Sequence, residues 1–195
     1  MNISKGTIGI IAAVVIIGLW AASAYNSMVG VQEDATTALA NVQSAYQRRA
    51  DLIPNLVETV KGYAAHEQGT FEAVVNARAK ATQITLDPEN LTAEKLQEFQ
   101  KAQGELGSAL GRLIAVSESY PDLKANENFR DLQVQLEGTE NRINEARNKF
   151  NSKVQNYNIT IRSFPKNLLA GIFGFRKMDK FEADADAQSA PKVKF

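Results

Sequence analysis

The stretch RRADLIPNLVETVKGYAAHE, residues 48–67, decides how this chain folds. Its apolar residues recur at helical spacing, yet Pro54 lies in the middle. Proline lacks a backbone N–H and its ring presses on the carbonyl four residues earlier, so a continuous helix is expected to kink there. Alternatively, Asp51 caps a restarted helix whose first turn tolerates a proline. We therefore interpret Pro54 as a helix joint.

The same stretch contains the single histidine of the chain, His66, next to Glu67. Catalysis by this pair would need a nucleophile, a metal or a second base. The chain carries no HExxH, GxSxG, phosphate-binding glycine loop or paired-acid motif. His66 is thus interpreted as a surface or helix-end residue, and the sequence predicts a protein that is not an enzyme and uses no cofactor or metal.

Charge and composition narrow the function further. The 195 residues include 22 Lys and Arg and 22 Asp and Glu, so the formal net charge is zero. No nucleic-acid partner is expected, because such a partner requires a basic face that offsets phosphate charge. The chain has no cysteine, which excludes disulfides, thiolate catalysis and cysteine metal sites.

A long stretch without charge lies between Lys5 and Glu33. About 20 apolar residues cover the ~30 Å hydrocarbon core of a bilayer, so residues 1–25 are predicted to form a membrane anchor. The small residues 22–24 offer the alternative of a cleaved signal peptide, but the apolar run is longer than a usual signal h-region. The anchor residues are Ile8, Ile10, Ile11, Val14, Val15, Ile16, Ile17, Leu19 and Trp20.

Charges on the two sides of the anchor indicate its orientation. Lys5 and the terminal amine precede the span, whereas Glu33 and Asp34 follow it. Basic residues mark the cytoplasmic side of a membrane helix. The sequence therefore predicts a single-pass protein whose larger, C-terminal part lies outside the cytoplasm.

Residues 26–165 predict an all-α domain, an antiparallel up-down four-helix bundle with long helices. Each of four segments carries a one-sided apolar stripe at 3-4 spacing, and only Arg49 interrupts the first. Representative stripe residues are Met28, Val42, Leu56, Phe71, Val74, Leu96, Phe99, Leu113, Phe129, Ile143, Phe150 and Tyr157.

Helix boundaries are predicted from glycine, proline and capping residues. Gly69 is expected to end the first helix, and Pro88 breaks the chain after the second. Thr92 is expected to cap the third helix, which stops near residues 120–121, and Pro165 ends the fourth.

Three glycines lie along one side of the third helix: Gly104, Gly107 and Gly111. Each costs a helix about 1 kcal/mol relative to alanine. Such a cost is explained most simply by a second helix that approaches closely. The glycines therefore predict close helix packing, either inside the bundle or against a neighbouring subunit.

The segment KNLLAGIFGFRK, residues 166–177, follows the fourth helix. Since the first helix leaves the membrane directly and the fourth runs back along it, this segment should return close to the membrane surface. It is expected either to cover the open end of the bundle core or to lie in the interface and attract anionic lipid. The candidate contact residues are Lys166, Leu168, Leu169, Ile172, Phe173, Phe175, Arg176 and Lys177.

Residues 178–195 are predicted to form a disordered tail. Glu182, Asp184 and Asp186 alternate with alanine there, but the glycine and glutamate of a calcium loop are missing. No metal site is therefore expected in the tail.

Three stretches of the chain resemble the LemA family of bacterial membrane-anchored proteins. They are residues 48–67, YPDLKANENFRDLQVQLEGTENRINEARNKFN (120–151) and YNITIRSFPKNLLAGIFGF (157–175). Leu39 stands where many relatives carry an aromatic residue, and the tail after Phe181 is expected to lie outside the shared pattern. The resemblance implies one helix in the bacterial inner membrane, a soluble antiparallel bundle and no enzyme activity. It also links the chain with membrane organisation, through a magnetosome-associated relative, and with neighbouring membrane proteases.

Two kinds of function follow from these features. The leading hypothesis is a membrane-anchored, non-enzymatic helical scaffold that forms a homo-oligomer and organises or remodels membrane or partner proteins. The alternative is an adaptor or chaperone-like subunit of a membrane protease or quality-control complex. Both place the protein on a lipid bilayer, and the second requires a membrane protein partner.

Overall fold

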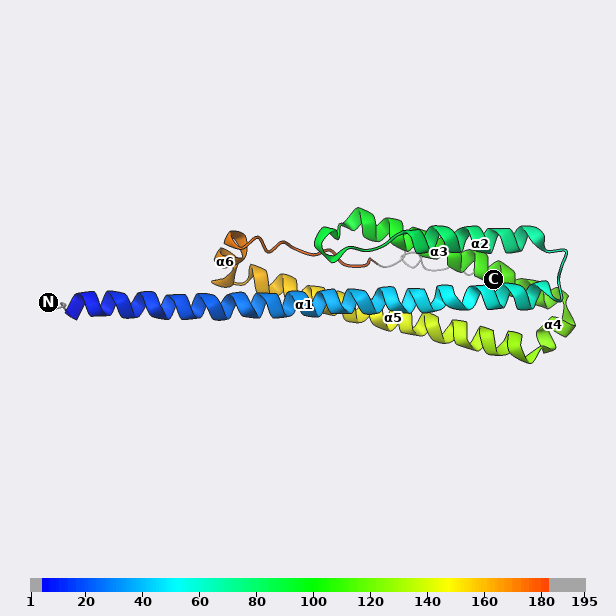
Figure 1. Cartoon of the computed structure of the whole chain (residues 1–195), viewed down its shortest axis with the longest axis horizontal. Helices are drawn as coiled ribbons and strands as arrows, with labels where there is room; N and C mark the ends of the chain where they lie inside the picture. Colours follow the sequence, from blue (N-terminus) through cyan, green and yellow to red (C-terminus); the bar gives the residue numbers. More distant parts are fainter. Residues whose placement is uncertain (1–4, 183–195) are drawn as a thin grey trace, which may run out of the picture.

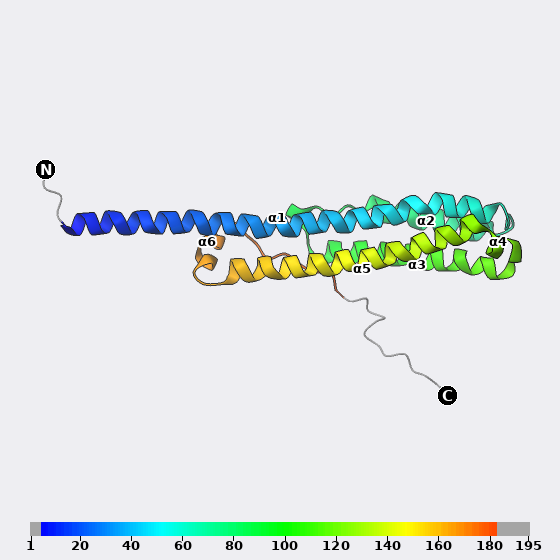
Figure 2. The ribbon, with the colours of Figure 1, turned by 90° about the horizontal axis from the view of Figure 1, so that it is seen from below.

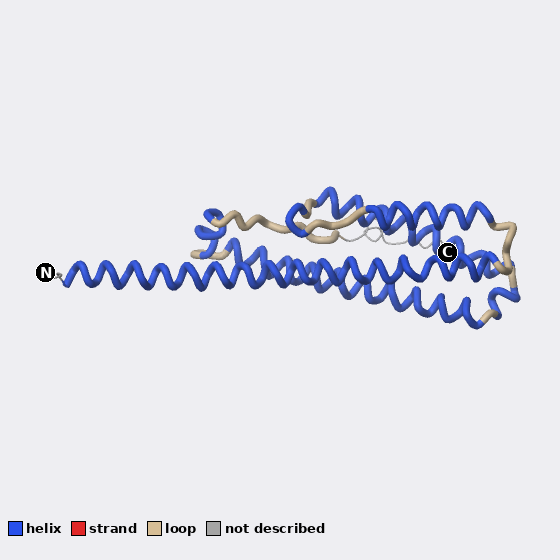
Figure 3. The backbone as a smooth tube through the Cα atoms, in the orientation of Figure 1, coloured by secondary structure: helices blue, strands red, loops and turns tan. Residues whose placement is uncertain are grey.

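A computed structural model describes residues 5–182 of the chain (Figure 1). Helices dominate this part, and no strand occurs among residues 5–182 (Figure 3), so the predicted all-α class is confirmed. The α-helices are α1 (Lys5–Lys61), α2 (Gln68–Gln83), α3 (Ala93–Val116), α4 (Pro121–Ala125), α5 (Glu127–Arg162) and α6 (Lys166–Ile172), with the 3-10 helices η1 (Pro88–Asn90) and η2 (Ser117–Ser119).

Helix α1 continues from the apolar segment into the bundle without a break. Its 57 residues, at about 1.5 Å each, make a rod of about 85 Å, much longer than the ~30 Å hydrocarbon core of a membrane. The N-terminal part of α1 stands clear of the other helices, whereas the C-terminal part packs among them (Figures 1 and 2). The division expected after residue 25 therefore falls inside one helix.

Helices α1 and α5 pack along each other as an antiparallel pair. Lys153 Nζ of α5 lies 2.6 Å from Asp34 Oδ2 of α1, and Glu140 of α5 pairs with Arg49. The later position on α1, Arg49, pairs with the earlier position on α5, Glu140, so the two helices run in opposite directions. Helices α2 and α3 pack together and lie along this pair (Figure 2).

The bundle contains two hydrophobic core clusters. The membrane-proximal cluster is built from Met28, Leu39, Val42, Tyr46, Leu96, Phe99, Ile143, Phe150, Val154, Tyr157 and neighbours. The distal cluster is built from Ile53, Leu56, Val60, Phe71, Val74, Leu106, Leu113, Leu123, Phe129, Leu132, Leu136 and neighbours. Polar residues separate the two along three helices: Arg49 on α1, Gln103 on α3 and Thr139 on α5, all buried.

The first helix ends earlier than predicted. Helix α1 ends at Lys61, and Gly69 lies in the first turn of α2, so the prediction that Gly69 ends the helix is wrong. The N–H groups of Tyr63 and Ala64 both bond to the carbonyl of Val60, and Ala64 is buried beside the distal core. Ala64 is thus buried where the chain turns, and Gly69 does not adopt the left-handed conformation of a helix-ending glycine.

Other helix ends follow the predicted capping chemistry more closely. The N–H of Lys95 donates to Thr92 Oγ1 at 3.3 Å, which confirms Thr92 as the N-cap of α3. Asp87 caps η1 by accepting from the N–H of Glu89, and its side-chain bond with Asn90 is the main cause that lowers the pKa of Asp87. Helix α3 ends at Val116, before the predicted stop near residues 120–121.

Helix α1 runs through Pro54 without restarting, so Asp51 is not the cap of a second helix. Because Pro54 has no N–H, the carbonyl of Ala50 loses the donor that residue 54 would otherwise supply. Arg78 of α2 fills this role, since its Nε donates to the Ala50 oxygen at 2.8 Å. The proline therefore exposes an acceptor that holds α2 against α1.

This contact gives a testable coupling between Pro54 and Arg78. Arg78→Met is expected to lower the free energy of unfolding by about 2 kcal/mol, because a half-buried carbonyl loses a charged donor. In a Pro54→Ala background the new N–H can bond to Ala50, so the same change should cost less than about 1 kcal/mol. Urea unfolding followed by circular dichroism measures both, with Lys80→Met, an exposed site on α2, as the control. Equal costs of Arg78→Met in the two backgrounds would contradict the coupling.

The segment after α6 is ordered over part of the predicted tail. Met178 and Phe181 are buried in the membrane-proximal core, so the predicted disorder does not begin at residue 178. The prediction of disorder followed from the acidic composition of the tail, which gives no weight to the two apolar side chains that are buried here. Asp184 and Asp186 lie outside the described residues.

Candidate functional site

Among residues 5–182, the apolar part of α1 up to Trp20 is left uncovered by the other helices. All nine predicted anchor residues are exposed, from 40% for Trp20 to 68% for Ile10 and Leu19. Only 6% of the most apolar window of α1 is buried, and α1 is the one helix among residues 5–182 that is long and apolar enough to cross a membrane. Water would be a poor solvent for such a surface, whereas lipid matches it.

Helix α6 lies beside α1 where the apolar part ends (Figures 1 and 2). The ring of Tyr25 on α1 contacts the rings of Phe173 and Phe175, with centroids 5.0 Å and 5.7 Å apart. Lys166 Nζ also donates to Ser27 Oγ at 2.9 Å. These contacts fix the segment that follows α5 at the base of the anchor.

The α6 segment has a buried side and an exposed side. Ala170 is buried in the membrane-proximal core, and Leu169 and Phe175 pack against that core. The segment therefore covers the end of the bundle core, which is one of the two alternatives expected from the sequence. Its other side is apolar and exposed, and we call it the foot: Phe164 (81%), Leu168 (61%), Ile172 (76%) and Phe173 (51%).

Basic residues flank the foot in the sequence. Arg176 and Lys177 are exposed, and Lys166 is partly exposed. Lys177 Nζ lies 3.6 Å from Asp179, an exposed pair that is worth little energy. The Tyr157 hydroxyl donates to the carbonyl of Arg176 at 2.8 Å, and burial raises the pKa of this phenol. The basic residues are thus held next to the apolar foot.

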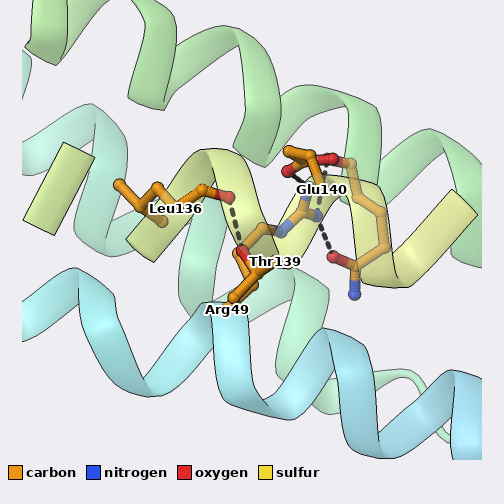
Figure 4. A network of polar contacts seen from close by, with 5 residues as sticks. Arg49, Leu136, Thr139 and Glu140 are labelled. Carbon is orange, nitrogen blue, oxygen red and sulfur yellow. Dashed lines mark hydrogen bonds and ion pairs between the residues drawn. The ribbon is translucent and has the colours of Figure 1, made fainter. Parts of the chain in front are cut away.

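A polar layer crosses the bundle between the two core clusters (Figure 4). Arg49, only 4% exposed, donates to Glu140 and to the side-chain and backbone oxygens of Gln103. Its guanidinium also lies 5.2 Å from the ring centroid of Tyr46. The Nε of Arg49 is buried without a hydrogen-bond partner.

The layer ties four helices together: Arg49 of α1 bonds to Glu140 of α5 and to Gln103 of α3, and Gln103 also donates to the carbonyl of Ala81 on α2. Thr139 satisfies its own hydroxyl by donating to the carbonyl of Leu136 (Figure 4). A buried charge with fixed partners disfavours helix registers in which those partners are lost. The layer is thus suited to holding register, and it contains no nucleophile beside a base.

His66 lies exposed in the turn between α1 and α2. The carboxylate of its neighbour Glu67 accepts a hydrogen bond from the Tyr120 hydroxyl at 3.4 Å. Within residues 5–182, no three or more His, Asp or Glu side chains gather as a metal site.

Within residues 5–182, no helix closely approaches the three glycines of α3 on the side where a Cβ would point. A Cβ added to Gly104, Gly107 or Gly111 would meet no atom within 4 Å, and Gly104 and Gly111 are exposed. The expectation that their partner lies inside the bundle is therefore wrong. The low helix propensity of glycine marks this side of α3 as unusual, but it does not indicate which segment packs there.

The open space around these glycines leads to a stability prediction. Gly104→Ala and Gly111→Ala are each expected to raise the free energy of unfolding by about 1 kcal/mol, because alanine favours the helix and its methyl group has room. Urea unfolding in detergent measures the gain. A loss of stability in either variant would show that the space is filled in the folded monomer.

Two functional elements were missed by sequence reasoning. One is the bond from Arg78 to Ala50, which no local pattern indicates. The other is a pair of asparagines on α5, Asn151 and Asn158, that bind the backbone of the segment after α6. Their spacing of seven residues within the apolar stripe was the available signal.

The chain is similar to several characterised sequences. It is 29% identical over 174 residues to Magnetosome protein MamQ of Magnetospirillum gryphiswaldense, covering 80% of this chain and 64% of that protein. It is 30% identical over 175 residues to Magnetosome protein MamQ 2 of Paramagnetospirillum magneticum, covering 81% and 64%. Protein LemA of Metamycoplasma hominis is 24% identical over 145 residues, covering 74% and 63%. The chain thus spans less than two thirds of the length of each relative.

The LemA family matches residues 38–195. The match includes residues beyond Phe181, so the expectation that the tail lies outside the shared pattern is wrong. It also includes the polar layer, the glycine surface and the foot described above. This chain belongs to the LemA family.

Proposed function

We propose that this protein is a non-enzymatic scaffold, anchored by α1 in the bacterial inner membrane, that self-associates and organises membrane or partner proteins. The foot is the observation that carries the proposal. It has four exposed apolar side chains beside the end of the apolar part of α1, and we expect the lipid headgroups at that level. Lys5 precedes the span, which supports an extracytoplasmic position of the bundle.

Magnitudes indicate which interaction holds the foot on the membrane. Full burial of a large apolar side chain is worth roughly 1.5–3 kcal/mol, and the foot presents four. Each basic residue close to anionic lipid adds about 1 kcal/mol. The apolar term is larger, so contact is expected even on neutral lipid, and anionic lipid strengthens it.

The exposed glycines of α3 are the surface that we assign to self-association. Exposed glycines at helical spacing let a second helix approach closely, and Gly104 and Gly111 have open space around them. The names of two relatives refer to the magnetosome. A role in organising a membrane compartment is consistent with those names.

A single fluorophore tests whether the foot contacts lipid. Because the chain has no cysteine, Ile172→Cys carries one NBD label in the full-length protein in phosphatidylcholine liposomes. Its emission is expected to shift to the blue and to be quenched by spin-labelled lipid. The matched control is Val134→Cys, which is 67% exposed on α5 beside the distal core. Equal emission and quenching at the two positions would overturn the membrane contact.

A further inference from the structure

The segment of residues 177–182, which we call the strap, binds α5 through two asparagine side chains. Asn158 Nδ2 donates to the carbonyl of Met178 at 2.8 Å, and its Oδ1 accepts from the N–H of Met178 at 3.0 Å. Asn151 forms the same pair of bonds with Phe181, both at 2.9 Å. Each amide therefore pairs with a backbone in the way that a strand would.

The spacing of the asparagines matches an extended peptide. Seven residues of helix separate Asn151 from Asn158, a rise of about 10.5 Å. The three steps from Met178 to Phe181 span about 10 Å in extended backbone. The side chains of Asn151 and Asn158, which we call the clamps, are thus spaced to bind an extended segment. They bond to backbone N–H and C=O groups, which every residue except proline provides.

Two side chains of the strap add specificity. Phe181 is 4% exposed, and its ring centroid lies 5.4 Å from that of Phe150; Met178 is 9% exposed. The intervening Asp179 and Lys180 are partly or fully exposed. The site therefore takes an extended segment with apolar residues at its first and fourth positions.

One side of the strap faces a groove. The turn that brings the strap back onto its own bundle contains one residue with a left-handed backbone. A groove of about 640 Å³ runs beside it and is lined by Asn158, Ile159, Arg162, Met178 and neighbours. Gly174, which begins the return from α6, has φ +76° and is the one residue with positive φ among residues 5–182. A strap leaving at another angle would bypass its own clamps.

We propose that the two asparagine clamps form a peptide-binding site that accepts the strap of a neighbouring copy as well as its own. The bonds are identical in both cases, because they involve the same backbone and the same two apolar side chains. Each copy is anchored by its own α1, so the clamps and straps of neighbouring copies lie at the same height above the membrane. This raises their effective concentration and favours exchange over capture of a free peptide. The exchange rests on the self-association proposed above and gives it a molecular link.

Crosslinking between two tagged copies tests the exchange. Lys180 Nζ lies 3.3 Å from Gln155 Oε1, so cysteines at these positions are within reach of a short bismaleimide. One full-length copy carries Gln155→Cys and the other Lys180→Cys, and they are expressed together. Asn156→Cys replaces Gln155→Cys in the control, since residue 156 is also exposed on α5.

The interchain product is expected to exceed the Asn156→Cys background at least fivefold. Gly174→Ala in the Lys180→Cys copy penalises the left-handed turn that seats its strap on its own bundle by about 1–2 kcal/mol, so it should raise the yield of interchain product about 5- to 30-fold. An interchain product at background level in copies that still purify together would overturn strap exchange alone. Copies that do not purify together at all would overturn self-association and the exchange with it.

Discussion

Glu140→Ala is expected to lower the free energy of unfolding by about 3 kcal/mol. The change leaves the Arg49 guanidinium, 4% exposed, without its ion-pair partner between the two core clusters. A buried charge that loses its partner typically costs about 3–5 kcal/mol. The lower end applies because the Glu140 side chain is 50% exposed and water screens part of the interaction.

Urea unfolding of the detergent-solubilised full chain, followed by far-ultraviolet circular dichroism, measures this loss. Glu137→Ala removes an exposed carboxylate one turn earlier on α5 and should change stability by less than about 0.5 kcal/mol. Similar values for the two variants would mean that Arg49 does not depend on Glu140.

Phe150→Ala is expected to cost about 4 kcal/mol. Phe150 is 1% exposed in the membrane-proximal core, and its ring contacts that of Phe181 in the strap. The substitution leaves a cavity on α5 and removes an aromatic contact worth about 0.5–1.5 kcal/mol. Detachment of the strap, residues 177–182, from α5 should accompany the loss of stability.

Phe164→Ala is the matched control for the aromatic deletion. Phe164 is 81% exposed, so its removal should change the unfolding free energy by less than about 0.5 kcal/mol while it reduces the apolar area of the foot. The same unfolding experiment compares the two variants. A large loss of stability from Phe164→Ala would indicate that this residue is buried in the protein and does not face lipid.

Much of the fold follows from periodic patterns in the sequence. The long helices and the cap at Thr92 depend on local spacing and hydrogen bonding, and both are found in the structure. Helix α1 instead ends before Ala64, which is buried in a core made by distant segments, and no local pattern around Gly69 indicates that core. The order after α6 likewise depends on Asn151 and Asn158, which lie far away in the sequence.

The site was predicted less completely than the fold. The foot was anticipated because an antiparallel return places an apolar segment near the anchor, and Tyr25 contacts Phe173 in the structure. The glycine partner was misplaced because helix propensity reports a cost in one helix and not the position of another. Arg49 interrupts a stripe in the sequence, but only the packed helices reveal Gln103 and Glu140 as its partners.

Binding between copies is the property on which the scaffold role depends most directly. Two copies with different affinity tags, expressed together and solubilised in mild detergent, are captured through one tag. The second copy should be recovered with the wild-type protein. Gly104→Leu combined with Gly111→Leu should reduce recovery about tenfold, equivalent to ~1.4 kcal/mol.

Gln135→Leu, at an exposed position of α5, should leave the recovery unchanged. Mixing separately solubilised copies before capture controls for association after extraction. Recovery that depends on the glycine surface and is absent after mixing is the result expected of a membrane scaffold. Failure to recover a second copy of the wild-type protein would contradict that role.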